Sequence, residues 1–308
     1  MKKETRQPLS SNSFSIAFSV LMLALLVALS LRWNVHGQNG NSVTTVSAAS
    51  FVPALAPETI AAAFGTKLAI RTEIATSVPL PTTLAGTTVK VNGVFAPLFF
   101  VSVNQINYLI PPNIAPGNAQ VIVTSGDGTV STGTVQVANI APSVFTANAS
   151  GTGLPAAVLL RLTAAGQQIF ERIDQPLVFK QQGDRLFLLL YLCGIRQAAP
   201  GTVKALVAGN ELPTDFAVAP GFVGLDQVNV ELPGYLSGRG RVNLQIKVGN
   251  ALSNIVEIEM GGPDLRATPT TTVLSSANPA VAGQEVVFTV RVGAVGNDRI
   301  PSGNVVLT

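Results

Sequence analysis

The sequence predicts an all-β protein made of tandem β-sandwiches that follow an N-terminal signal helix. The chain of 308 residues is only 11% charged and carries 28 Gly and 20 Pro between stretches rich in Val, Thr, Leu and Ile. This composition favours short strands joined by turns. An internal repeat of strand-like segments and an N-terminal stretch with the character of an export signal complete the prediction.

Residues 1–37 have the three parts of a secretory signal: a basic start, an apolar run from Phe14 to Leu31, and small residues beyond it. Val35 and Gly37 fit the positions before a cleavage site, which predicts a mature chain beginning at Gln38. The alternative is an uncleaved anchor, since a run of this length lies at the short end of what spans a bilayer. We therefore expect a secreted or cell-surface protein that meets the membrane only through this segment, if it is uncleaved.

Charge and residue usage exclude several classes of function. The formal net charge of +3 comes from the N-terminus: without residues 1–37, fifteen basic residues face fifteen acidic ones, so no nucleic-acid partner is expected. Cys193 is the only cysteine, and His36, the only histidine, lies within the predicted signal. A mature chain without histidine lacks Ser-His and Cys-His catalysis and the usual zinc sites. We expect no enzyme, no cofactor and no intrachain disulfide.

A repeated strand organises the chain between these ends. Asn104–Pro111 matches Asp226–Pro233 without a gap, and both alternate with period two before a proline. The residues expected to face the two cores are Ile106, Tyr108 and Ile110 in the first copy and Val228, Val230 and Leu232 in the second, while Gln105, Asn107, Gln227 and Asn229 point away. Apolar strands at 60–68 and 186–195 precede the copies. Each copy thus has the content of a small immunoglobulin-like sandwich.

The predicted organisation has seven parts. They are a signal peptide or anchor at 1–37, a flexible lead-in at 38–47, a first sandwich at 48–140, connecting strands at 141–185, a second sandwich at 186–260, a Gly/Pro linker at 261–270 and an incomplete domain at 271–308. The connecting strands are expected to pack against one or both sandwiches. The sequence leaves open whether the two copies form separate sandwiches or one joined unit.

Several motifs also carry a family resemblance. They are Ala48–Phe51, Phe64–Thr66, Asn92–Pro97, Gln105–Pro111, Ala141–Thr146 and Pro220–Asn229. Together they resemble an uncharacterised β-sandwich family of large secreted acidobacterial proteins, whose halves are similar to the IPT/TIG branch of immunoglobulin-like folds. The resemblance implies export and a β-sandwich fold and brings no catalytic residues. From Thr271 the chain is similar to bacterial Ig-like repeats, but it holds fewer residues than the roughly 100 that close such a sandwich.

Each residue that suggests chemistry also has a structural interpretation. Cys193 lies in a continuous apolar run, which predicts a buried strand and an inert thiol. Asp127 between two glycines suits calcium or a tight turn, and the turn is favoured because further acidic ligands are not near; Asn297 and Asp298 are likewise expected to form a turn. Glu171 and Asp174 could form a glycosidase carboxylate pair, but nothing in the sequence places them across a cleft, so a solvated strand edge is favoured.

Basic and aromatic residues likewise have both a functional and a structural interpretation. Arg196, Lys204, Arg239 and Arg241 could serve DNA binding, which some IPT-type folds perform, but the neutral mature chain and the export signal argue against it. Phe222 and Tyr235 lie in connections where sandwiches display recognition residues, which makes them candidate ligand contacts. The favoured interpretation is that both rings close the ends of a core.

The leading hypothesis is a non-catalytic extracellular protein whose sandwiches act as a structural spacer or as adhesion and binding modules. Its partner would be an extracellular protein or a glycan. Two alternatives stay open: the accessory region of a larger secreted enzyme, and a carbohydrate-binding module.

Overall fold

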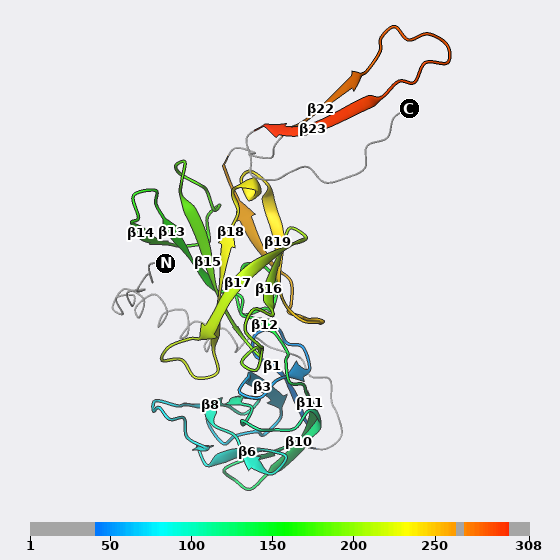
Figure 1. The fold of residues 1–308 in the computed structure, drawn as a ribbon. Helices are drawn as coiled ribbons and strands as arrows, with labels where there is room; N and C mark the ends of the chain where they lie inside the picture. The colour runs from blue at the N-terminus through cyan, green and yellow to red at the C-terminus, as the bar shows by residue number, and fades with distance from the viewer. Residues whose placement is uncertain (1–40, 263–267, 296–308) are drawn as a thin grey trace, which may run out of the picture.

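The protein consists of β-sheets, in agreement with the predicted fold class. The computed structural model describes residues 41–262 and 268–295, in which the only helix is the 3-10 turn η1 (Gly234–Leu236). Within these ranges no helix has the length and apolarity required to cross a bilayer. The predicted signal segment, residues 1–37, lies outside them. Figure 1 shows two sandwiches in contact and a separate hairpin.

The first sandwich, here called module 1, is formed by two facing sheets. Their strands are, in one sheet, β1 (Val43–Ser47), β3 (Ile60–Gly65), β9 (Gln105–Leu109), β8 (Leu98–Val101) and β4 (Glu73–Ile74), and in the other β2 (Ala54–Leu55), β11 (Val130–Val137), β10 (Gly117–Thr124), β6 (Thr87–Val91) and β5 (Thr83–Leu84), with β7 (Val94–Phe95) beside β6. Ile106, Tyr108 and Ile110 are fully buried in the core between the sheets, as their period-two spacing predicted.

The predicted lead-in is wrong at its C-terminal end. Val43–Ser47 is not flexible: it forms β1 and pairs antiparallel with β3, Val43 opposite Gly65. Val43, Thr45 and Ser47 alternate inward and are buried, and Tyr108 donates a hydrogen bond to the Thr45 hydroxyl at 3.2 Å. The small polar side chains resemble a loop in sequence, but here their hydroxyl groups are satisfied inside the module.

The second sandwich, module 2, is one ten-stranded sheet that folds over its own core. The strands are β14 (Gln168–Glu171), β13 (Ala157–Leu162), β15 (Arg185–Cys193), β18 (Asp226–Leu232), β17 (Asn210–Val218), β16 (Val203–Val207), β19 (Gly240–Val248) and β20 (Ala251–Leu252) in spatial order, with β12 (Ser143–Val144) beside β15 and β21 (Val256–Met260) beside β19. The two layers share β17, whose first half pairs with β16 and whose second half pairs with β18. Val228, Val230 and Leu232 face the enclosed core.

The strands predicted as connectors are part of module 2. β12 and β13 both pair with β15, and β14 continues the sheet beyond β13. Residues 141–185 therefore complete the second sandwich, because they extend the layer that contains β15 and β18. The repeat alone did not indicate this, because module 1 has no counterpart of β14.

The C-terminal described segment is an antiparallel hairpin. β22 (Thr268–Ser275) pairs with β23 (Phe288–Val295), Val273 opposite Val290. The predicted linker thus ends before residue 268, since Thr268–Thr270 already belong to β22. Asn297 and Asp298, the predicted turn, lie outside the described residues.

Candidate functional site: the junction between the modules

A third hydrophobic cluster, the junction cluster, joins the two modules. Its buried members are Ala48, Ala49, Ile60, Ala62 and Leu109 from module 1 and Phe145, Ala156, Tyr191, Cys193, Ala219 and Leu225 from module 2. β3 is consequently buried on both faces, with Ala61 and Ala63 in the module core and Ile60 and Ala62 in the junction. The two copies are therefore distinct sandwiches that share an apolar contact.

A glycine permits the closest approach across the junction. Gly224 adopts a φ of +74°, and a Cβ atom at this position would lie 2.7 Å from both Ile60 Cγ1 and Leu109 Cδ1. That distance is shorter than van der Waals contact allows, so a side chain here would push the loop of residues 219–225 away from β3 and β9. The loop of residues 219–225 is thus seated against module 1.

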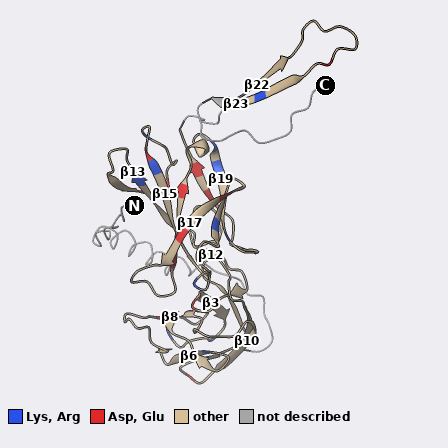
Figure 2. Cartoon of the chain, viewed as in Figure 1, with Lys and Arg blue, Asp and Glu red and all other residues tan. Residues whose placement is uncertain are grey.

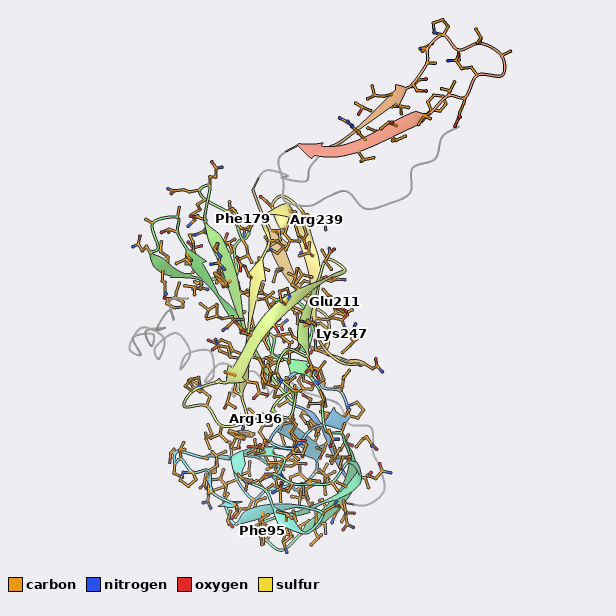
Figure 3. The ribbon with its side chains drawn as sticks, in the orientation of Figure 1. Phe95, Phe179, Arg196, Glu211, Arg239 and Lys247 are labelled. Atoms are coloured by element: carbon orange, nitrogen blue, oxygen red, sulfur yellow. The ribbon has the colours of Figure 1, made fainter. Side chains whose placement is uncertain are left out.

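An arginine adds an ionic link at the edge of the same contact. Arg196 of module 2 donates from Nη1 to Glu58 Oε1 of module 1 and from Nε to Asp226 Oδ1, both at 2.9 Å. Its Nη2 also donates to the Leu225 carbonyl oxygen at 3.2 Å. Burial raises the pKa of Asp226, while Arg196 opposes this shift. Figure 3 shows Arg196 at the level where the two modules meet.

Cys193 lies in this junction rather than in a module core. Its side chain is fully buried, and its thiol interacts with the Ile60 backbone and the Ser47 side chain of module 1. Burial raises the pKa of the thiol to about 12, and the Asp226 charge acts in the same direction. The predicted buried strand is confirmed, and a thiol that stays protonated at neutral pH is a poor nucleophile.

The two predicted ligand contacts lie in different parts of module 2. Phe222 is half-buried and packs against the junction cluster. Tyr235 is half-buried in η1 and packs against the module 2 core, with the Arg239 guanidinium 5.9 Å from its ring centre. The structure does not bring the two rings together, and ligand contact by either stays a prediction.

The acidic candidates are held by local partners. Asp127 accepts a hydrogen bond from the Thr129 backbone N–H at 2.9 Å, which lowers the pKa of Asp127 and accounts for a turn. Asp174 pairs with Arg172 on the surface at 2.6 Å. In the described ranges no three His, Cys, Asp or Glu side chains gather as a metal site would require.

The basic candidates are dispersed. Arg241 of β19 lies 3.6 Å from the Glu257 carboxylate and 4.0 Å from the Glu259 carboxylate, both on β21. Arg196 is committed to the junction, and Arg239 stacks near Tyr235. These residues thus serve separate contacts.

The sequence prediction missed a buried arginine that organises module 2. Arg161 of β13 is 2% exposed and bonds Glu171 through Nε and Nη2, at 3.0 and 2.9 Å, and Asp184 through Nη1 at 3.0 Å. Its Nη2 also donates to the Val178 carbonyl oxygen. The Arg161 hydrogen bonds hold the pKa of Glu171 at about 2. The signal was present in β13, where Arg161 takes an inward position of an otherwise apolar strand.

Comparisons with known proteins assign no family to the chain. No family model matches the chain, and no curated protein matches it. Similar solved structures include the mixed-linkage glucan utilization protein SGBP-B of Bacteroides ovatus with a bound heptasaccharide, at 10% identity and a TM-score of 0.30, where 75% of this chain covers 48% of that chain. Domains 5 and 6 of the S-layer protein SbsC are 13% identical with a TM-score of 0.23, and the match covers 71% of this chain and 96% of that chain. A tandem of titin Ig domains is 8% identical with a TM-score of 0.21, and the match covers 68% of this chain and 93% of that chain. At these scores the likenesses assign neither an activity nor a partner.

Proposed function

We propose that the chain is a non-catalytic extracellular protein whose two sandwiches act together as one rigid spacer. The observation that carries the proposal is the junction. Modules joined only by a connector move relative to each other. Here an apolar cluster, the close approach at Gly224 and the Glu58–Arg196–Asp226 link join them at one orientation. A fixed orientation is the property that a spacer needs and that a flexible tether lacks.

The chemistry of the described residues supports a non-catalytic role. The Cys193 thiol is buried and protonated, and Glu171 is fully engaged by Arg161 and Lys180. Neither group has the exposure or the poised pKa that a nucleophile or a general acid requires. Reproducible hydrolysis of a polysaccharide or peptide by the purified chain would contradict this part of the proposal.

Rigidity can be tested by distance measurement between spin labels. The variant Gln120→Cys/Asn243→Cys places one label on β10 of module 1 and one on β19 of module 2, both at exposed positions. We expect a single narrow distance distribution by pulsed electron spin resonance. A broad distribution would overturn the spacer proposal. The unsubstituted chain is the control, because its only cysteine is buried and should take up no label.

Export has an independent test. Mass spectrometry of the chain purified from outside the cell should find Gln38 as the first residue. A surface protein that still begins at Met1 would support the anchor in place of the cleaved signal. Recovery of the chain only from the cytoplasm would contradict the extracellular location.

A further inference from the structure

The junction uses a face of module 1 that has an equivalent in module 2. The outer face of a module is the side of its repeated strand, β9 or β18, and of the neighbouring strand that points away from the module core. β9 matches β18 in sequence, and β3 pairs with β9 as β15 pairs with β18. Asn107 lies opposite Ala62, and its counterpart Asn229 lies opposite Leu189. The outer face of β3 and β9 therefore corresponds to the outer face of β15 and β18.

The two equivalent faces differ in what covers them. In module 1, Ile60 and Ala62 are buried by module 2, and the polar neighbour Asn107 is only 2% exposed. In module 2 the counterpart of Ile60 is Phe187, which is half-buried beside the half-buried Leu160 of β13. Farther along β15, Tyr191 and Cys193 already belong to the junction cluster. The module 2 face is thus an apolar surface continuous with an interface that the protein already uses.

Module 2 covers module 1 with its loop end, defined as the end of the module where β15 ends at Cys193 and β18 begins at Asp226. The corresponding end of module 1 lies after β3 and before β9. It carries two exposed apolar residues, Ile70 at 50% and Val103 at 46%. On the module 2 face charge is balanced, because Glu231 is paired with Arg185, whose guanidinium lies 4.9 Å from the centre of the Phe187 ring. The two surfaces therefore match in apolar character.

We propose that the chain self-associates head to tail, with the loop end of module 1 of one copy docked on the outer face of module 2 of the next. The contact would repeat between chains the arrangement that joins the modules within one chain. Such a contact joins two different surfaces, so it leaves one of each free on every dimer and propagates into a ring or a filament. Exposed apolar surface of this kind commonly marks a protein interface.

The test is sedimentation of the full chain, purified in the form its host produces, over increasing concentration. We expect assembly beyond a dimer, and we expect Phe187→Glu and Ile70→Glu each to weaken the association at least about tenfold, since central apolar residues dominate such contacts. Leu252→Glu on β20 is the matched control, because Leu252 is 51% exposed and lies on neither surface. It should assemble as the unsubstituted chain does.

Mixing the two variants tests the head-to-tail geometry. Each variant keeps one intact surface, so an equimolar mixture should form a dimer that cannot grow, at concentrations where neither variant associates alone. A chain that stays monomeric at all concentrations overturns the proposal, as does a mixture that stays monomeric or an equal effect of Leu252→Glu. The result is independent of the spacer function when labelled chains are diluted with unlabelled ones, because the spin-label distances are then measured within one chain.

Discussion

The two modules share a repeated strand but differ in the polar contacts around it. Both keep the same amide pair on its outer face, Gln105 with Asn107 and Gln227 with Asn229. Module 1 carries few charged residues, and its buried Tyr108 hydroxyl bonds the neutral Thr45. Module 2 has charged side chains along β13, β15, β17 and β19 (Figure 2) and buries Arg161 among carboxylates. The same alternation of apolar residues can therefore be completed by hydrogen bonds or by an ionic hub. The two solutions should respond differently to substitution and to pH.

The largest expected effect follows the loss of Arg161, which pairs with Glu171 and Asp184 inside module 2. Arg161→Leu leaves the buried Asp184 carboxylate without its cationic partner, and breaking a buried pair from one side costs roughly 3–5 kcal/mol. We expect amide hydrogen exchange to accelerate in β13, β14 and β15 while β10 and β11 of module 1 keep their protection.

The matched control for the hub is Arg172→Leu. Arg172 forms its ion pair with Asp174 at the surface, with the arginine side chain 86% exposed. Surface pairs of this kind contribute about 0–1 kcal/mol, so exchange in β13–β15 should change little. Equal acceleration by both substitutions would show that Arg161 has no special structural role.

The next effect concerns the contact between the modules. Gly224→Ala places a methyl group against Ile60 and Leu109, and overpacking of this kind costs about 1–3 kcal/mol. The modules themselves should stay folded while the junction opens more often. The native Cys193 reports the opening, since its thiol reacts only when exposed, and we expect its alkylation to accelerate at least about tenfold.

A second glycine separates packing from backbone strain. Gly221 lies in the same loop with a φ of +79°, but a Cβ atom there meets nothing within 4 Å. Gly221→Ala therefore carries the same conformational strain without the clash. An alkylation rate that rises equally in both variants would refute the role of Gly224 in the junction.

The sequence predicted the core-facing residues of the repeated strand but not the contact between the modules, for a physical reason. Period-two alternation identified the residues that face each core, because that pattern depends on the strand alone. It also indicated that Asn107 points away from the core, which is correct, but not that this outer position is only 2% exposed. Burial of an outer face depends on residues distant in the chain, such as Arg196 and Glu58, which lie 138 positions apart. No local pattern connects them.

A smaller effect should appear as a pH dependence of module 2. The pKa of Glu171 is about 2 in the fold, against 4.5 for an unperturbed glutamate. A depressed folded pKa stabilises the fold above the unfolded value, and that stability is lost as the pH falls from about 4.5 to 2. Because Glu171 is partly solvated and its pairs are screened, we expect only about 1 kcal/mol. Urea denaturation at pH 7 and at pH 2.5 should show that Glu171→Gln removes this contribution of about 1 kcal/mol to the pH dependence of stability. A pH dependence equal to that of the unsubstituted chain would contradict the low pKa of Glu171.

The smallest effect is expected for the neutral hydrogen bond between Tyr108 and Thr45 in module 1. Tyr108→Phe removes the 3.2 Å hydrogen bond to Thr45, and a neutral bond of this kind contributes about 1 kcal/mol or less. Burial raises the pKa of Tyr108, so the hydroxyl stays protonated and its bond is the same from acidic to neutral pH. The loss of stability should therefore be equal at pH 7 and pH 2.5, unlike that of Glu171→Gln. A cost for Tyr108→Phe that varied with pH would mean that the first module also depends on charge, and the contrast between the two modules would fail.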